Sequence, residues 1–241
     1  HLEAYDKTTV NYNRDIEVFP VLQAIFENIY GECPYKSPTD MGVNMAGNCI
    51  SDDEVCREAA NQEIIRRYYK ERCAIKRGVG KIEALRKLEL LMKKSGLSDE
   101  DRPVVKHALI REEATHHPAC AIELPDGSIM TGKTTDLMVS SAAAVLNTIK
   151  EMAGIPHKEH NRYRLKNSDP RLNVHDVLTA LSISSAVNEN AKLALNEFEN
   201  LKGLEMHSTV LLSESDERII RKLLINLTCE PRYEFSRMFQ K

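Results

Sequence analysis

Apolar residues recur at the three- and four-residue spacing of amphipathic helices through the first half of the chain. Pro20 suits the first turn of the earliest helix, and Gly31 lies just past its end. A capping box of Ser51 and Glu54 opens the next helix. The connections between the later helices are short, which favours antiparallel neighbours. The predicted helices cover residues 19–30, 51–76, 81–94 and a segment that begins at Ser98.

Between the first two helices lies a polar segment, residues 37–49, with two glycines and neither a helical nor a strand period. We expect a loop here, and long loops in compact proteins often line sites. Asp40, Asn44 and Asn48 are therefore candidates for a polar pocket. The alternative is a packed connector whose side chains bond to their own backbone.

The pattern changes near Pro118, where short apolar runs alternate with turns. Two such runs flank Pro125-Asp126-Gly127 and predict a β-hairpin with residues 128–132 as its second strand. Near the C-terminus, a strand, a crossover helix and a strand favour parallel pairing. The further elements expected are helices over 136–153, 173–188 and 190–201, a strand over 204–212, a helix from Ser213 and a strand over 225–229.

Residues 127–134 also match the P-loop pattern of nucleotide-binding proteins, reading Gly-Ser-Ile-Met-Thr-Gly-Lys-Thr. A working P-loop follows a buried strand, and its glycine-rich bend opens a helix. Here Gly127 belongs to the turn signal, so the residues that would hold phosphate are expected in the second hairpin strand. The hairpin prediction therefore argues against a nucleotide site of this kind.

These elements predict an α+β fold in which a helical subdomain precedes a three-layer α/β/α subdomain. We expect a helix and polar loop over residues 1–50, the helical subdomain over 51–118 and the α/β subdomain over 119–241.

Composition and charge exclude some classes of partner. The 241 residues are 42% hydrophobic and 29% charged, which is typical of a soluble globular protein. A formal charge of −3 gives no basic field for nucleic acid or a membrane surface, and no apolar run approaches the length of a membrane span. We therefore expect no nucleic-acid and no membrane partner, whereas a small anionic metabolite and a homo-oligomer stay open.

The cysteines give no sign of a metal site or a disulfide framework, because they are widely scattered and form no Cys-x-x-Cys motif. We expect reduced thiols in a cytoplasmic protein and no bound metal, and the sequence leaves the cofactor unknown. The six cysteines stand at positions 33, 49, 56, 73, 120 and 229.

Long motifs are spread over nearly the whole chain, at residues 38–50, 124–135, 169–172, 207–213 and 225–231. They resemble the bacterial family of unknown function DUF1846. Members of that family are about twice as long, which implies that this chain corresponds to a C-terminal half. Some members are labelled ATP-dependent peptidases, a label that the P-loop-like match would explain and that the hairpin prediction makes unlikely. The resemblance supplies no catalytic residues.

The hairpin, the Thr131-Gly132 pair and the alanine-rich helix that follows are similar to the core of cytidine deaminases. In those enzymes, zinc ligands and a glutamate stand near the start of this helix. Here residues 139–145 hold neither, and no Pro-Cys-x-x-Cys motif follows. The similarity thus implies a shared topology without zinc-dependent deamination.

The leading candidate for an anion site lies between the second hairpin strand and the next helix. A helix N-terminus offers free N–H groups, and Lys133 adds a positive charge. We expect this turn to lie near residues 38–49 or 226–232. The alternative is a threonine helix cap beside a solvated lysine. The candidate residues are Thr131, Lys133, Thr134, Thr135 and Asp136.

Other candidates are single residues whose partners the sequence does not place. His116, His117 and His207 are possible bases or ligands, although a lone histidine is more often structural. Cys229 is a possible nucleophile or a buried thiol. Arg171 and Arg232 are candidates for anion binding, and Arg171 has the alternative of pairing with Asp169.

The sequence supports two hypotheses of function. The first is a cytosolic enzyme that acts on a small anionic metabolite, phosphorylated or nucleotide-like, because polar loops stand at element ends where α/β folds place ligands. The second is a non-catalytic module for ligand binding or oligomer assembly. No residue is assigned a catalytic role.

Overall fold

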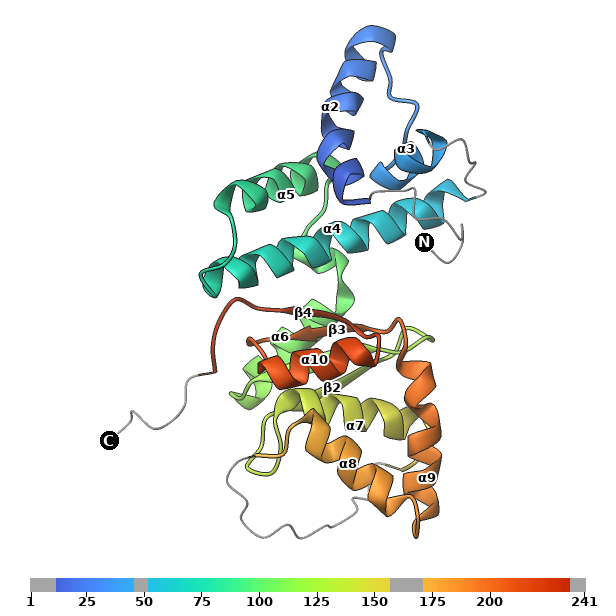
Figure 1. Ribbon diagram of the computed structural model, residues 1–241, viewed down its shortest axis with the longest axis vertical. Helices are drawn as coiled ribbons and strands as arrows, with labels where there is room; N and C mark the ends of the chain where they lie inside the picture. The colour runs from blue at the N-terminus through green and yellow to red at the C-terminus, as the bar shows by residue number, and fades with distance from the viewer. Residues whose placement is uncertain (1–11, 46–51, 157–170, 235–241) are drawn as a thin grey trace, which may run out of the picture. The chain divides into compact units, whose positions relative to one another are not determined.

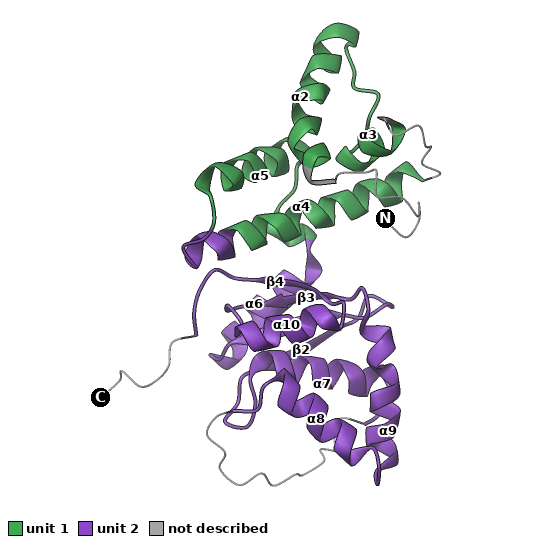
Figure 2. Ribbon diagram, in the orientation of Figure 1, with its two compact units in different colours: residues 1–71, 80–101 green, residues 72–79, 102–241 purple. Residues whose placement is uncertain are grey.

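The structure is a computed structural model that describes residues 12–45, 52–156 and 171–234 (Figure 1). It forms two compact units, shown in Figure 2. Unit 1 takes residues 1–71 and 80–101, and unit 2 takes residues 72–79 and 102–241. The subdomain boundaries expected at residues 50 and 118 stay predictions.

All the regular elements described in unit 1 are helices. Its elements are α2 (Tyr12–Tyr30), α3 (Pro38–Met45), the first part of α4 (Asp53–Lys76), α5 (Ile82–Ser95) and the short 3-10 helix η1 (Asp99–Asp101). The prediction of α5 is confirmed, including its left-handed C-cap at Gly96. The prediction that the first helix starts near residue 19 is wrong, since α2 starts at Tyr12 and contains Pro20 in its interior.

The loop expected over residues 37–49 is wrong for residues 38–45, which form α3. Ser37 Oγ accepts a hydrogen bond from the Asp40 N–H at 3.0 Å, and Asp40 accepts one from the Lys36 N–H at 2.7 Å. This arrangement satisfies free N–H groups at the helix start, with Pro38 in the first turn. The sequence did not predict this helix, because the segment contains two glycines and its apolar pattern, Met41 and Val43, is short.

The cap of α4 also differs from the expected one. Asp52 accepts hydrogen bonds from the N–H groups of Glu54 and Val55 at 3.1 and 3.0 Å. Ser51, the cap named from the sequence, lies outside the described residues.

Unit 2 is built on a four-stranded mixed sheet in the order β2-β1-β3-β4. Strand β1 is antiparallel to both β2 and β3, and β3 is parallel to β4, which confirms the predicted parallel pair. The elements are α6 (Pro103–Thr115), β1 (Ala119–Glu123), β2 (Ile129–Lys133), α7 (Ser140–Met152), α8 (Val174–Ser184), α9 (Glu189–Asn196), η2 (Glu197–Leu201), β3 (Glu205–Ser208), α10 (Glu214–Lys222) and β4 (Asn226–Cys229).

The predicted hairpin is confirmed. Strands β1 and β2 pair in antiparallel register from Ala119 opposite Lys133 to Glu123 opposite Ile129. Gly127 has a φ of 82°, a left-handed conformation that glycine adopts without strain. Residues 127–134 therefore form a turn and an edge strand, and this excludes a phosphate-wrapping P-loop at these positions.

The two faces of the sheet are covered by different helices, as the alternation of residues along β1 shows. Ala121 packs with Val104 and Ala108 of α6. Cys120 and Ile122 point to the other face, into a core shared with α7, α8, α9 and α10. The fold is therefore mixed α+β, as expected, and every strand is short.

Helix α7 starts at Ser140, four residues later than predicted. The intervening residues form a turn in which Thr135 Oγ1 accepts the N–H groups of Leu137 and Met138 at 3.3 and 3.2 Å. Thr134 Oγ1 then accepts the Ser140 N–H at 3.2 Å. The threonine side chains delay the helix because they offer the backbone another set of hydrogen bonds.

Candidate functional site

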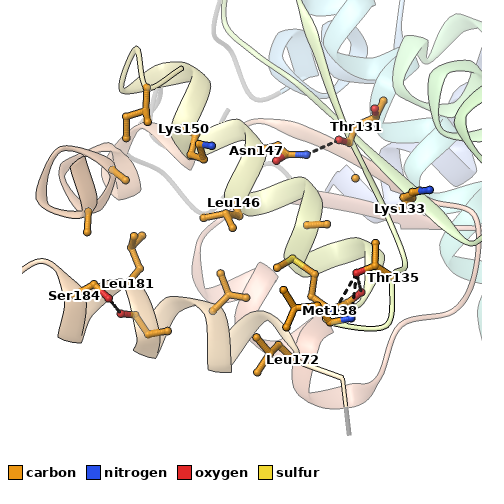
Figure 3. Close-up of a pocket in the computed structure, with 18 of the residues that line it drawn as sticks. Thr131, Lys133, Thr135, Met138, Leu146, Asn147, Lys150, Leu172, Leu181 and Ser184 are labelled. Atoms are coloured by element: carbon orange, nitrogen blue, oxygen red, sulfur yellow. Dashed lines mark hydrogen bonds between the residues drawn. The ribbon is translucent and has the colours of Figure 1, made fainter. Parts of the chain in front are cut away.

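A pocket of about 490 Å³ lies in unit 2 (Figure 3). Its walls are α7, α8 and α9, with β2 and the turn after it on one side. This volume falls within the range of small-molecule sites. Most of the lining is apolar and comprises Leu137, Met138, Ala143, Leu146, Ile155, Leu172, Val177, Ala180, Leu181, Ala191 and Ala194.

The polar part of the lining carries positive charge only. Three cationic side chains line the pocket: Arg111 of α6, Lys133 of β2 and Lys150 of α7. Among the described residues that line it, none is Asp, Glu, His or Cys. The neutral polar residues are Thr131, Thr135, Asn147, Ser184 and Asn190.

Gly132 explains why α7 lies so close to β2. A Cβ atom at this position would stand 2.1 Å from the Ala144 nitrogen and 2.6 Å from the Ala143 carbonyl carbon. Only glycine permits this approach of strand to helix backbone. The second glycine of the P-loop-like motif thus serves packing.

The close approach lets α7 reach the outer edge of β2. Asn147 Nδ2 donates a hydrogen bond to the Thr131 carbonyl at 2.9 Å, as Figure 3 shows. Lys150 follows one turn later on α7 and is only 9% exposed. The pocket wall therefore combines a strand edge with one polar stripe of an otherwise apolar helix.

Asp216 fixes the α8 wall. This carboxylate, at the start of α10, is 3% exposed. It accepts the Val174 N–H at 2.9 Å and the Ser141 hydroxyl at 3.4 Å. Because Ser141 belongs to α7 and Val174 to α8, one buried carboxylate ties the two helices that face each other across the pocket.

Three of the residues predicted for the anion site line this pocket: Thr131, Lys133 and Thr135. Thr134 is buried and acts as the cap described above, which matches its structural alternative. Asp136 lies in the turn ahead of α7 and not in its first helical turn. Lys133 therefore lines a pocket but does not lie at the N-terminus of α7.

Of residues 226–232, the four that form β4, 226–229, do not lie next to Lys133. Strands β2 and β4 are the two edges of the described sheet, and β1 and β3 lie between them. Asp40 and Asn44 belong to unit 1, and Asn44 Nδ2 donates to the Asp40 carbonyl at 2.8 Å and to its carboxylate at 2.5 Å. This pairing matches the alternative of a self-satisfied connector. Asn48 lies outside the described residues.

His207 and Arg232 belong to a polar network on the α6 side of the sheet. His207 is fully buried, its Nδ1 lies 2.9 Å from Thr228 Oγ1, and its Nε2 lies 3.6 Å from Glu230 Oε1. Burial lowers the pKa of His207, and the neighbouring Glu230 opposes this. Arg232 donates to the Thr209 carbonyl at 2.5 Å and pairs with Glu112.

The remaining candidates have local explanations. Arg171 pairs with Glu234 at 2.7 Å, while Asp169 lies outside the described residues. Burial raises the pKa of the Cys229 thiol well above its usual value, which disfavours a nucleophilic thiolate. His116 is the C-cap of α6, and His117 Nδ1 lies 2.6 Å from the Thr115 carbonyl oxygen.

Neither a metal-ligand cluster nor a membrane-spanning helix occurs among the described residues. Within them, no group of three or more His, Cys, Asp or Glu side chains is arranged to hold a metal ion. Cysteines 33, 56, 73, 120 and 229 are free thiols, and Cys49 lies outside the described residues. In the same part of the chain, no helix has the length and apolar character needed to cross a bilayer.

Sequence reasoning missed Arg111, Asn147 and Lys150. A signal was present for two of them, because Asn147 and Lys150 stand three residues apart on a predicted helix, beside its apolar residues Val145 and Ile149. Polar residues beside the apolar residues of a helix indicate that this side of the helix does not pack into the hydrophobic core. Arg111 gave no such signal, since its approach depends on the tertiary packing of α6 against β2.

Comparison with known proteins gives the family. The description "Domain of unknown function DUF1846, N-terminal" matches residues 1–96, and "Domain of unknown function DUF1846, C-terminal" matches residues 100–239. The chain is 46% identical over 254 residues to the UPF0371 protein stu1377 of Streptococcus thermophilus, covering 100% of this chain and 51% of that protein.

Two further relatives come from corynebacteria. The UPF0371 protein DIP2346 of Corynebacterium diphtheriae is 44% identical and a UPF0371 protein of Corynebacterium glutamicum is 45% identical, each over 254 residues, with 100% of this chain and 51% of the relative covered. The chain therefore spans about half the length of the curated relatives it matches. These matches show that the chain belongs to the bacterial DUF1846 family, whose curated members carry the name UPF0371.

Proposed function

We propose that unit 2 binds a small organic anion with an apolar body in the pocket between α7, α8 and α9. One observation carries this proposal: the described lining combines a large apolar surface with three cationic side chains and no carboxylate. An apolar pocket with a few convergent polar groups is the usual form of a small-molecule site. The charge of those groups selects for an anion.

The energetics favour such a ligand. Apolar area removed from water contributes about 25 cal/mol per Å², so the apolar lining supplies affinity. A hydrogen bond to a charged group adds about 1.5–3 kcal/mol and supplies selectivity. Lys133 is half-buried and Lys150 nearly fully buried, so water screens their charges less than at an open surface.

Of the two hypotheses from the sequence, the pocket supports ligand binding more directly than catalysis. Acid–base and nucleophilic catalysis most often use carboxylate, imidazole or thiol groups, and the described lining holds none of these. An enzyme that acts on an anionic metabolite would need reacting groups from outside this lining. We therefore favour a binding module and keep the enzyme as the alternative.

The experiment uses a fluorescent probe of matching chemistry, anilinonaphthalene sulfonate, which joins an aromatic body to a single anion. We expect it to bind one molecule per chain with enhanced fluorescence. The neutral analogue N-phenylnaphthylamine has the same aromatic body and should bind more weakly. Arg111→Ala should reduce the preference for the anion, and Lys192→Ala, an exposed lysine on α9 outside the pocket, should not. Equal binding of the two probes would refute the proposal.

We also propose a topology related to that of cytidine deaminases. The strand order β2-β1-β3-β4, with β1 antiparallel to its neighbours and β3 parallel to β4, supports it. The first residues of α7 are Ser140, Ser141 and Ala142, where those enzymes carry zinc ligands and a glutamate, so the proposal covers topology alone.

Two expectations from the sequence stay predictions. A cytoplasmic location is supported by free thiols at the described cysteines, which reducing compartments favour. Homo-oligomer formation has no support beyond the sequence argument.

A further inference from the structure

We propose that an exposed apolar side of α2 is the docking surface for the part of the polypeptide that the longer UPF0371 relatives carry outside their match to this chain. This surface, the α2 stripe, consists of Val21, Ile25 and Ile29. It belongs to unit 1 (Figure 2), so the proposal is independent of the pocket in unit 2.

The α2 stripe is a continuous side of one helix. Its residues follow one another at intervals of four, which places them within about 80° around the helix axis and over about 12 Å along it. The exposed fractions of Val21, Ile25 and Ile29 are 59%, 45% and 65%. Ile16 and Phe19 lie about 120–180° away from Ile25 around the axis, and each is 5% exposed. The helix therefore has a separate buried side, and the stripe is additional apolar surface.

The sequence around the stripe is nearly free of charge. Between Val18 and Ile29, α2 contains one charged residue, Glu27, which lies about 160° around the helix axis from Ile25. A helix side that faces water normally carries polar or charged side chains. The stripe therefore has the character of a contact surface.

Leu90 of α5 gives a contrast within the same unit. Its exposed fraction, 63%, is close to that of Ile29. The residues three and four positions away from it on either side are all basic: Arg86, Lys87, Lys93 and Lys94. Single exposed apolar residues of this kind are ordinary, whereas a contiguous apolar side marks an interaction site.

The length of the relatives points to the occupant. The proteins stu1377 and DIP2346 match 100% of this chain over only 51% of their own length, so about half of each relative lies outside the match. The C-terminal family model matches as far as residue 239, which favours the N-terminal side, next to α2, as the place of this further half. An apolar surface in the same polypeptide would meet the stripe at an effective concentration on the order of millimolar.

A second copy of this chain fits the stripe less well. Helix α2 carries three carboxylates, Asp15, Glu17 and Glu27, and one basic residue, Arg14. Two copies of α2 in contact would bring like charges together, which opposes association.

Photo-crosslinking of the full-length Streptococcus thermophilus relative tests the proposal. Benzoylphenylalanine, which on irradiation bonds to C–H groups within its reach, replaces the residue aligned with Val21, Ile29 or, as the matched control, Leu90, each in a separate variant. We expect both stripe positions to crosslink within the same chain to the half outside the match, as mapped by mass spectrometry of the digested protein. The Leu90 position should give no such crosslink. In the present chain, Ile29→benzoylphenylalanine should give no crosslinked dimer.

Each outcome decides for or against the proposal. A crosslink from either stripe position to the further half, without one from the Leu90 position, supports it. Crosslinked dimers would assign the stripe to a second copy and overturn it. Crosslinks confined to the matched half, no crosslinks, or equal crosslinking from all three positions would also overturn it. Because the two stripe positions are probed in separate variants, poor folding of one variant leaves the test in place.

Discussion

Two charged regions lie on the same sheet of unit 2, and they differ in charge balance. On the α6 side, each arginine of the network has a carboxylate: Arg102 pairs with Glu205, Arg232 with Glu112, and Arg72 with Glu230 at 3.7 Å. In the pocket beside β2, three cations share a lining that contains no carboxylate among its described residues. The degree of burial alone therefore does not distinguish charged residues of an ion-pair network from charged residues that line a pocket.

The balanced region has the features of a structural network. Arg102 is fully buried and donates to the Asn226 and Met206 carbonyls at 2.8 and 3.2 Å and to Thr228 Oγ1 at 3.1 Å. A buried arginine that meets a carboxylate and several carbonyls has its desolvation cost offset inside the protein. The pocket cations lie instead beside a cavity of about 490 Å³, with space for the proposed ligand.

The largest effect is expected from breaking the balanced region. Arg102→Met should lower the free energy of unfolding by about 3–5 kcal/mol, because Glu205 and two strand carbonyls lose a buried partner. Urea denaturation at neutral pH measures this loss. Lys133→Ala, from the unbalanced region, is the control and should change stability by less than about 0.5 kcal/mol. Similar losses in the two variants would remove the distinction between the regions.

The next effect concerns the packing that forms the pocket. Gly132→Ala should destabilise unit 2 by about 3 kcal/mol, the upper end of the overpacking range, because the new Cβ atom meets α7 backbone at 2.1 Å. It should also weaken probe binding, since Asn147 and Lys150 move with α7. Gly127→Ala is a matched control: nothing lies within 4 Å of its Cβ, so only the strain of a positive φ remains, about 1–2 kcal/mol. Probe binding should survive in that variant.

A smaller effect is expected when one cation is removed from the pocket. Lys133→Ala should weaken binding of anilinonaphthalene sulfonate by about 1–3 kcal/mol, or roughly 5- to 150-fold, because a charged hydrogen-bond donor is lost. Fluorescence titration measures the change, and the melting temperature should stay near that of the wild type. If probe binding is unchanged, Lys133 does not contact the ligand. Thr134 and Thr135 would then keep only their structural role in the predicted anion site, which is to accept backbone hydrogen bonds ahead of α7.

The sequence predicted the parts of unit 2 that depend on local chemistry. The Asp126-Gly127 turn, the start of α10 near Ser213 and the parallel β3–β4 pair follow from neighbouring residues and short connections. The start of α7 was misjudged, because Thr134 and Thr135 compete for backbone N–H groups in a way that propensity does not reveal.

The site was only partly predictable for a different reason. Lys133 was identified because it follows a strand, whereas the apolar wall opposite it comes from α8 and α9, which are distant in sequence. Nothing local to Arg111 indicates that it reaches the edge of β2. The pairing of Ser37 with Asp40, in contrast, was readable as a helix start and was overlooked beside two glycines.

The smallest effect is a pH dependence confined to the balanced region. Burial holds the pKa of His207 below its ordinary value of 6.5, with Glu230 opposing and Arg102 and Arg232 reinforcing the shift. The unfolded chain therefore binds a proton that the folded chain resists, so stability should fall as pH drops below about 6.5 and level off beneath the folded pKa. Burial raises the pKa of Glu230, but His207, whose Nε2 lies 3.6 Å from Glu230 Oε1, and the nearby Arg72 and Arg232 lower it by more. The pKa of Glu230 is therefore below its ordinary value, and its contribution to stability is lost further down, below about 4.5. Urea denaturation at pH values either side of 6.5 should show a drop in the free energy of unfolding of the wild type, and this drop should be smaller in His207→Gln.

Probe binding at the pocket should not follow the same pH profile, since none of its described lining residues is a histidine or a carboxylate. A shared pH profile would mean that the two regions are coupled through the sheet, and the separation drawn from their charge balance would not hold.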